Sequence, residues 1–316
     1  MVIKVLDCAT LGEGLSYESL EKLGDVSLYE YTEPFELVER ISDADVVIIN
    51  KIKMTKEVLS QCKSLKLICV FATGYDNIDV KYAKEAGIAV CNVPAYSTES
   101  VMLFTLSSVL SLVAHLEEYK SFVRSGEYTR QGKPNCLTPV FHEIKGMKWG
   151  IVGYGNIGKR VADVARALGA EVMINKRTKT DNEEITEIDT LIKECDIITL
   201  HCPLTDNTRG LISKERIALM KKNAILVNTA RGAVTDESAI AEAIKEQRIG
   251  GFGTDVYSVE PFSEEHPFYE IMNYPNVCLT PHAAWGAHES RVRCLGVICD
   301  NISAFKSGKF LNRVDK

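Results

Sequence analysis

The chain begins with short apolar runs that alternate with stretches of helical spacing, such as YESLEKLG and VKYAKEAG. The apolar runs are MVIKVLD, VSLYEY, DVVIIN, LKLICVFAT and IAVCNVP. Continuous Val, Ile and Leu runs of this kind are typical of strands in a parallel sheet that is buried on both faces. This part of the chain therefore predicts a parallel sheet with helices on both sides.

A second series of the same kind follows a long apolar stretch and a polar, loop-like region at 125–146. The apolar stretch, residues 101–116, contains serines and is shorter than the roughly 20 residues that span a bilayer, so we expect a buried helix. From about His288 the pattern is helical, and we expect this last segment to return to the first part of the chain. The strands of the second series are predicted in WGIVGYG, EVMIN, DIITLHCP, AILVNTAR, GGFGTDVY and NVCLTPH.

The two series predict an α/β protein with two doubly wound parallel-sheet domains. We expect a Rossmann nucleotide-binding domain at 100–287, inserted into a flavodoxin-like substrate domain at 1–99 and 288–316. The length of 316 residues agrees with two domains, because single cores stop growing at roughly 250–300 residues. Ligands bind at the carboxyl ends of strands in such sheets, so we expect a cleft between the domains there.

Composition narrows the class of protein further. The net charge of −6 argues against a nucleic-acid-binding surface. The first ten residues lack a basic region, so no signal peptide is expected. The ten cysteines form no CxxC pair and most lie in apolar runs, which predicts reduced thiols rather than a metal site. We therefore expect a cytoplasmic protein with no metal, no membrane partner and no nucleic-acid partner.

The stretch WGIVGYGNIG contains the spacing Gly153-x-Gly155-x-x-Gly158 between a predicted strand and a predicted helix. This context is what the dinucleotide-binding fingerprint requires. Gly153 permits the tight turn, Gly155 lets a pyrophosphate approach the backbone, and Gly158 lets the helix pack on the strand. The amides near Asn156 and Ile157 would then face the phosphates at the positive end of the helix dipole.

The same fingerprint continues with an acid about 20 residues later, which binds the ribose hydroxyls. In this chain Lys176, Arg177 and Thr178 occupy that place. A carboxylate would repel a 2′-phosphate, whereas two cations and a hydroxyl would bind one, so the pattern favours NADP over NAD. The alternative is an ordinary solvated turn, because lysine and arginine are frequent in turns.

Three later strand ends carry side chains that suit hydride transfer to a 2-oxo acid. Arg231 follows AILVN, Asp255 and Glu260 follow GGFG, and His282 follows NVCL. A guanidinium matches a substrate carboxylate, and a histidine can protonate the carbonyl oxygen as it gains charge. A carboxylate on the other ring nitrogen would orient the imidazole. His201, in LHCPLT, lies at an equivalent strand end, so position alone does not choose between the two histidines.

As a group these motifs resemble the D-isomer-specific 2-hydroxyacid dehydrogenases over nearly the whole chain. Within that family, NK at 50–51, ATGYDNID and Trp285 are most similar to glycerate dehydrogenases, also called hydroxypyruvate reductases. The motifs that carry the resemblance are FATGYDNIDV, GIAVCNVPAYSTESV, GIVGYGNIG, LHCPLTDNTRGLI, AILVNTARGAVTDE, GTDVYSVEP and LTPHAAWG.

The resemblance implies roles for individual residues. His282 is implied as the general acid and base, paired with Glu260, and Arg231 as the residue that binds the substrate's carboxylate and carbonyl. His282 and Arg231 would share the substrate with Lys51, Thr73 and Gly74 of the first domain. Asp255 would contact the nicotinamide carboxamide. The remaining cofactor contacts implied by the family are His201, Pro203, Thr208, Thr229, Ala230 and Ala284.

The family also implies a homodimer with the helix from Val101 in the interface, and closure of the two domains before hydride transfer. One departure from the family pattern is Met102 and Leu103 after YSTESV, where Ala-Glu or Ala-Gln is usual; it bears on the pocket or the dimer contact. The expected reaction is NAD(P)-dependent interconversion of hydroxypyruvate and D-glycerate, or of glyoxylate and glycolate. The alternatives are a dehydrogenase for D-lactate or a bulkier 2-oxo acid, and a nucleotide-sensing scaffold similar to corepressors.

Overall fold

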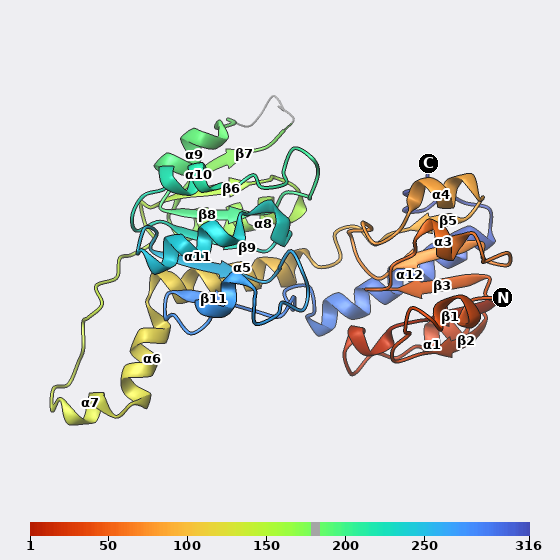
Figure 1. Cartoon of the computed structure of the whole chain (residues 1–316), viewed down its shortest axis with the longest axis horizontal. Helices are drawn as coiled ribbons and strands as arrows, with labels where there is room; N and C mark the ends of the chain where they lie inside the picture. Colours follow the sequence, from red (N-terminus) through yellow and green to blue (C-terminus); the bar gives the residue numbers. More distant parts are fainter. Residues whose placement is uncertain (178–183) are drawn as a thin grey trace. The chain divides into compact units, whose positions relative to one another are not determined.

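The structure, a computed structural model, describes residues 1–177 and 184–316, and the chain divides into two compact units (Figure 1). The first unit comprises Met1–Ser97 and Trp285–Lys316, and the second comprises Thr98–Ala284. We expected the divisions after residues 99 and 287.

Local packing explains where the divisions fall. Helix α5 (Thr98–Val113) begins directly after the first division. After the second division, the indole of Trp285 packs edge-on against Phe71 and Tyr96, with ring centroids 6.3 Å and 6.4 Å away. Trp285 therefore belongs to the core of the first unit, although its motif begins in the second.

The first unit contains a five-stranded parallel sheet with the order β2-β1-β3-β4-β5. This is the flavodoxin-like order, as the alternation of apolar and amphipathic stretches predicts. Every strand is short, and all except the edge strand β2 are mostly buried, which agrees with their apolar sequences. The strands are β1 (Val2–Val5), β2 (Asp25–Leu28), β3 (Val46–Ile49), β4 (Leu67–Val70) and β5 (Ala89–Cys91).

Two apolar layers cover the faces of this sheet. Helix α12 (His288–Lys306) packs on one face, where Cys294, Leu295 and Ile298 join the buried strand residues. The final segment of the chain thus returns to the first unit, as predicted. Its end also pairs with the edge strand, since Val314 N donates to Val90 O at 2.9 Å. The other helices are α1 (Glu18–Glu21), α2 (Leu37–Arg40), α3 (Lys56–Leu59) and α4 (Val80–Glu85).

The second unit contains a parallel sheet with the order β11-β10-β9-β8-β6-β7 among its described residues. The order reverses between β6 and β8, which defines the switch point where Rossmann-type sheets bind dinucleotides. Beyond β7, Thr186 N donates to Ile174 O at 2.7 Å and extends the pairing along that edge. The strands are β6 (Lys148–Val152), β7 (Glu171–Asn175), β8 (Ile197–Leu200), β9 (Ile225–Asn228), β10 (Gly251–Thr254) and β11 (Val277–Leu279).

Helices cover both faces of this second sheet (Figure 1). Helix α5 and α8 (Asn156–Ala167) pack on one face around the fully buried Trp149. Three other helices pack on the opposite face, namely α9 (Ile188–Glu194), α10 (Lys214–Leu219) and α11 (Glu237–Lys245). The predicted buried helix is therefore α5, although it begins before residue 101.

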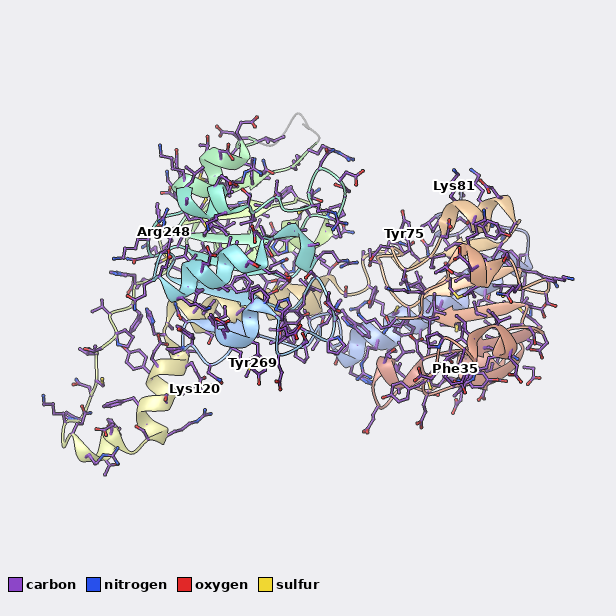
Figure 2. All side chains as sticks on the ribbon, viewed as in Figure 1. Phe35, Tyr75, Lys81, Lys120, Arg248 and Tyr269 are labelled. Carbon is purple, nitrogen blue, oxygen red and sulfur yellow. The ribbon has the colours of Figure 1, made fainter. Side chains whose placement is uncertain are left out.

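The segment after α5 projects from the second unit as an arm (Figure 1). It consists of α6 (Leu116–Arg124), α7 (Glu127–Arg130) and the chain that returns to β6, and neither helix has a buried residue. Figure 2 marks it at Lys120. We expected only a loop at 125–146, and α7 corrects that expectation. Among the described helices none alone is long and apolar enough to cross a membrane, although α5 and α6, bent by 65°, pass the length and composition test as a pair.

Candidate active site

Three neighbouring strands of the second unit present the predicted chemical groups at one edge of the sheet. Because β9, β10 and β11 are adjacent and parallel, their carboxyl ends lie side by side. Arg231 follows β9, Asp255 directly follows β10, and His282 follows β11. The sheet therefore brings together in one unit the groups that the sequence places at separate strand ends.

Glu260 and His282 form a carboxylate–imidazole pair at this edge. Oε2 of Glu260 lies 2.6 Å from Nδ1 of His282, and the two side chains retain 29% and 26% of their exposure. Nδ1 faces the carboxylate, so Nε2 is the ring nitrogen on the side of the imidazole away from Glu260. The backbone of His282 has φ 51°, in the left-handed region, and its N–H donates to Thr280 O at 3.1 Å.

Asp255 holds the backbone on both sides of His282. Its Oδ1 accepts from Thr280 Oγ1 at 2.6 Å and from Ala283 N at 2.9 Å, and its Oδ2 accepts from Ala284 N at 2.8 Å. Burial raises the pKa of Asp255 above its ordinary value, although these hydrogen bonds act in the opposite direction. The observed contacts of Asp255 thus shape the loop that carries His282, and its contact with a nicotinamide stays a prediction.

Arg231 extends from a turn that packs tightly against the loop of Glu260. Its Nη1 donates to Ala230 O at 2.8 Å, and the Asn228 amide holds the turn by donating to Arg231 O at 2.9 Å. A Cβ at the next residue, Gly232, would lie 2.0 Å from the carbonyl carbon of Tyr257. Only glycine permits this approach, which fixes the end of β9 against the loop that follows β10.

The glycine turn lies at the switch point of the sheet, where the fingerprint predicts cofactor binding. Gly153 has φ +93°, and a Cβ there would lie 2.6 Å from the backbone nitrogen of Cys202. A Cβ at Gly158 would lie 2.0 Å from Gly153 O, so the helix needs glycine to pack on the strand. These two contacts agree with the roles that the spacing predicts.

Gly155 differs from its two partners in the turn. A Cβ at Gly155 would meet no atom within 4 Å, so protein packing does not require glycine there. Gly155 is also the N-cap of α8 and supplies no side-chain cap, so Asn156 and Ile157 begin the helix with amides that can face an anion. This open cradle fits the pyrophosphate of a dinucleotide cofactor.

Two lysines flank the ring of Tyr154, between the first two glycines. Lys176 Nζ lies 5.6 Å and Lys159 Nζ 5.7 Å from the ring centroid. Arg177, next to Lys176, is exposed, and Thr178 lies outside the described residues. The sequence analysis missed Lys159; the signal was a cation in the first turn of the helix, directly after Gly158.

His201 lies in a different environment from His282. Its Nε2 lies 3.0 Å from Thr199 Oγ1, and its Nδ1 is buried with no hydrogen-bond partner among the described residues. Burial lowers the pKa of His201 to about 3. His201 is therefore neutral at ordinary pH, and within residues 1–177 and 184–316 no carboxylate pairs with it as Glu260 does with His282.

The other predicted cofactor residues lie after the ends of β8, β9 and β11. Thr208 Oγ1 donates to Pro203 O at 2.6 Å and closes the loop after His201. Thr229 Oγ1 lies 2.9 Å from the hydroxyl of Thr105 on α5, while Ala230 and Ala284 are buried. Among the residues described, no group of His, Cys, Asp and Glu could hold a metal ion.

The predicted substrate residues of the first unit lie at the carboxyl ends of β3 and β4. Thr73 is held by its hydroxyl, which donates to Val93 O at 2.8 Å, and Gly74 follows it. Lys51 N donates to Oδ2 of Asp7 at 2.6 Å. Asp7 lies after β1, at the β1/β3 switch point, and burial raises its pKa. The sequence analysis missed Asp7, whose signal was an acid at the end of the first apolar run.

Comparison with known proteins supports the predicted family. Residues 106–284 match the family described as D-isomer specific 2-hydroxyacid dehydrogenase, NAD binding domain. The chain is 35% identical to a hydroxypyruvate reductase of Blautia hydrogenotrophica over the full length of both. It also resembles the D-lactate dehydrogenase of Aquifex aeolicus in complex with NAD and lactic acid, with a TM-score of 0.88, 29% identity, and 100% and 99% of the two chains covered.

A further solved structure differs in its cofactor. An acyclic imino acid reductase in complex with NADPH and D-Arg has a TM-score of 0.86 and 28% identity, and the alignment covers 99% of this chain and 100% of that one. The similar structures thus include one bound to NAD and one bound to NADPH. They support a nicotinamide cofactor in the second unit. They do not distinguish NAD from NADPH, which depends on the ribose turn, the turn after β7 that contains Lys176 and Arg177.

Proposed function

The chain belongs to the D-isomer-specific 2-hydroxyacid dehydrogenases, and on that premise we propose that it reduces a small 2-oxo acid, hydroxypyruvate or glyoxylate, to the 2-hydroxy acid. The observation that carries this proposal is the Glu260–His282 pair, 2.6 Å apart, at the same sheet edge as Arg231. The similarity to a hydroxypyruvate reductase over its full length supports the choice of acid.

In the proposed reaction Arg231 binds the carboxylate and carbonyl of the acid, since a guanidinium can make two parallel hydrogen bonds. The carbonyl oxygen gains negative charge during reduction, and His282 donates a proton to it from Nε2. Glu260 holds the ring through Nδ1 and stabilises its protonated form. When bound, the nicotinamide cofactor supplies the hydride.

Residues of the first unit are proposed to contact the acid in addition to Arg231 and His282, and the second unit is proposed to bind the cofactor. Lys51, Thr73 and Gly74 lie at the carboxyl ends of neighbouring strands, where α/β sheets bind ligands. Backbone amides near Thr73 and Gly74 would hold the carboxylate of the acid. Closure of the two units would then exclude water from the reacting groups.

NADPH is the proposed cofactor. Lys176 and Arg177 occupy the place of the acid that binds ribose hydroxyls, and Lys159 adds a third cation near the ring of Tyr154. Two lysines beside one ring, with Arg177 next in the sequence to one of them, favour the additional negative charge of a 2′-phosphate. Thr178 is proposed to contribute a hydroxyl.

We also propose a homodimer that uses the arm. Leu137 and Val140 of its returning chain each retain 71% of their exposure. That chain also borders a hollow of about 910 Å³, together with Leu112 of α5 and Ile249 before β10. A second copy would cover these apolar side chains. Sedimentation of the purified protein should give about twice the mass of 35.1 kDa, and a single-chain mass would contradict the dimer.

A matrix of substrates and cofactors tests the proposed function. Purified protein is mixed with hydroxypyruvate, glyoxylate, pyruvate or 2-oxoisocaproate, each with NADPH or NADH, and loss of cofactor absorbance is followed. We expect the highest kcat/KM for hydroxypyruvate or glyoxylate with NADPH. A preference for pyruvate or 2-oxoisocaproate would favour a D-lactate or branched-acid dehydrogenase. Cofactor binding without turnover of any acid would favour the nucleotide-sensing scaffold.

A further inference from the structure

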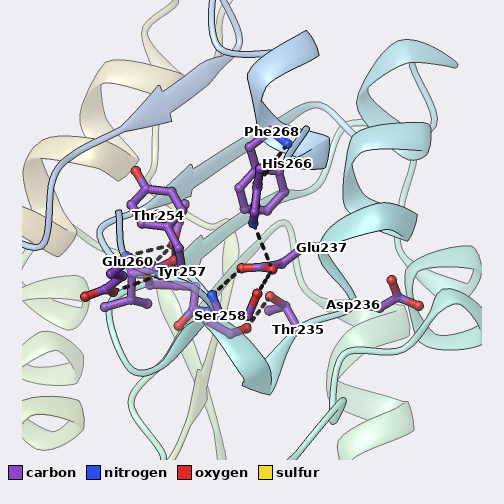
Figure 3. A network of polar contacts seen from close by, with 12 residues as sticks. Thr235, Asp236, Glu237, Thr254, Tyr257, Ser258, Glu260, His266 and Phe268 are labelled. Carbon is purple, nitrogen blue, oxygen red and sulfur yellow. Dashed lines mark hydrogen bonds and ion pairs between the residues drawn. The ribbon is translucent and has the colours of Figure 1, made fainter. Parts of the chain in front are cut away.

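Besides Glu260 and His282, the second unit contains another carboxylate–imidazole pair, formed by Glu237 and His266. Glu237, the first residue of α11, has Oε2 3.1 Å from Nε2 of His266 (Figure 3). The two side chains retain only 10% and 8% of their exposure, whereas Glu260 and His282 retain 29% and 26%. Glu237 and His266 are thus largely buried, and their contacts show which segments of the unit they hold in place.

The protonation of His266 follows from its neighbours. Nδ1 accepts from the backbone N–H of Phe268 at 3.2 Å, as the cap of η3 (Pro267–Glu270). A proton on Nδ1 would place two donors against each other, so the ring is neutral and carries its proton on Nε2. Nε2–H therefore donates to Glu237, and the ring joins this carboxylate to the buried Phe268.

Glu237 uses its other contacts to hold the loop of Glu260. Its Oε1 accepts from Ser258 N at 2.9 Å, and its Oε2 accepts from the Ser258 hydroxyl. Ser258 lies two residues before Glu260, on the loop that follows β10. The carboxylate of Glu237 is thereby a fixed point for a loop whose own residues 258–260 are exposed.

Tyr257, the residue before Ser258, connects this loop to both Glu260 and His282. Its backbone N–H donates to Oε1 of Glu260 at 3.0 Å, and its hydroxyl donates to Thr280 O at 2.9 Å. Thr280 O also accepts from His282 N. One residue thus holds the Glu260 carboxylate and the backbone of His282.

The ring of Tyr257 is held by the second pair and its aromatic neighbours. Its centroid lies 4.7 Å from that of Phe262 and 6.2 Å, at right angles, from that of His266. The His266 ring packs in turn on Phe268 at 5.0 Å, inside the core of the unit. Displacement of His266 would therefore move Tyr257 as well as Ser258.

We propose that Glu237 and His266 are positioning residues for proton transfer. They anchor Ser258 and Tyr257, and through them they set the distance and orientation of Glu260 relative to His282. Neither residue touches the reacting atoms. The inference rests on the proposed function, because it takes Glu260 and His282 as the proton-transfer pair. Errors of about 1 Å in such a pair can reduce turnover up to a hundredfold, which makes an anchor of this kind measurable.

Two substitutions at His266 test its contact with Glu237 separately from its contact with the backbone N–H of Phe268. His266→Gln places an amide near the position of Nε2 and keeps the donor to Glu237, whereas His266→Asn keeps the cap on Phe268 N and loses that donor. At the other partner, Glu237→Gln presents an amide to the Nε2–H and Ser258 hydroxyl donors. Glu242→Gln is the matched control, since Glu242 lies on the same helix and its exposed carboxylate pairs with Lys214.

We expect Glu237→Gln and His266→Asn to lower kcat about tenfold with little change in KM for the cofactor. His266→Gln should restore most of the rate, and Glu242→Gln should stay within about twofold of wild type. Because Glu260 pairs with Nδ1 of His282, its displacement should move the alkaline limb of the reduction profile to lower pH. A residue that only stabilises the fold would leave that limb in place.

Backbone deuterium exchange at Tyr257 and Ser258 gives a readout that does not depend on turnover. Exchange should rise in Glu237→Gln and His266→Asn and stay at the wild-type rate in Glu242→Gln. If the wild type reduces no acid, the proposed function fails, while exchange still shows whether the anchor holds the loop. Unchanged exchange, or wild-type kinetics and pH profile in both variants, would overturn the inference.

Discussion

The carboxyl edge of the second sheet has two halves that are built differently. At the ends of β6, β7 and β8, the glycine turn offers backbone amides, and Lys159, Lys176 and Arg177 supply positive charge. At the ends of β9, β10 and β11, hydrogen bonds run from Asp255 through the backbone near His282 to Glu260. In the proposed function the first half receives an anionic ligand, and the second half holds its side chains in place for proton transfer.

The two strand-end histidines show what this difference means chemically. His201 is half-buried beside the hydroxyl of Thr199, and burial lowers its pKa to about 3. His282 is half-buried and has the carboxylate of Glu260 on Nδ1. A ring that stays neutral cannot deliver a proton near neutral pH, whereas the ring of His282 is held through Nδ1 by the carboxylate of Glu260. The partners of a histidine, rather than its place at a strand end, distinguish the two roles.

The largest expected effect comes from replacing each of these two histidines in turn. His282→Ala should reduce kcat by about 10³-fold, because general acid catalysis contributes roughly 10²–10⁴. His201→Gln keeps a polar group near Thr199 and should lower kcat less than about tenfold. Steady-state rates give both numbers, and fluorescence titration with the cofactor checks that each variant still binds it. A near-wild-type rate in His282→Ala would show that another group protonates the substrate.

A smaller effect is expected at the cofactor half of the edge. Arg177→Ala removes a charge from the ribose turn and should raise KM for NADPH about thirtyfold, since hydrogen bonds to charged groups contribute roughly 1.5–3 kcal/mol. KM for NADH should change little. Arg166→Ala is the control, because it removes the same charge from an exposed site on α8. Equal changes with both cofactors would mean that Arg177 does not read the 2′-phosphate.

Much of this architecture could be predicted from local sequence. The continuous apolar runs indicated the parallel strands, and the spacing of Gly153, Gly155 and Gly158 indicated the turn after β6. The residues at the ends of β9, β10 and β11 were predicted from their places at strand ends and from the family resemblance. In each case the signal lies within one strand and the turn that follows it.

The contacts that the sequence did not reveal join distant segments. Glu237 and His266 are 29 residues apart, and each alone reads as an ordinary surface residue of a helix start or a loop. The choice between His201 and His282 depends on the partner of each ring, and the carboxylate that pairs with His282 lies 22 residues away in the sequence. Tertiary packing creates these environments, so the structure was needed to find them.

The smallest expected effect is on the free energy of unfolding, and it tests whether His201 is held neutral in the folded protein. The pKa of His201 is about 3 in the folded protein and roughly 6.5 in an unfolded chain, so the unfolded state binds the proton first as pH falls. Stability is therefore lost progressively below about pH 6.5, by about 1 kcal/mol between pH 7 and pH 5.5. His201→Gln should lack this loss. Urea unfolding, followed by Trp149 fluorescence in a Trp285→Phe background, isolates the second unit, since the chain has 2 tryptophans. If wild type and variant lose stability equally over that range, His201 is not held neutral in the folded protein, and the contrast between the two histidines fails.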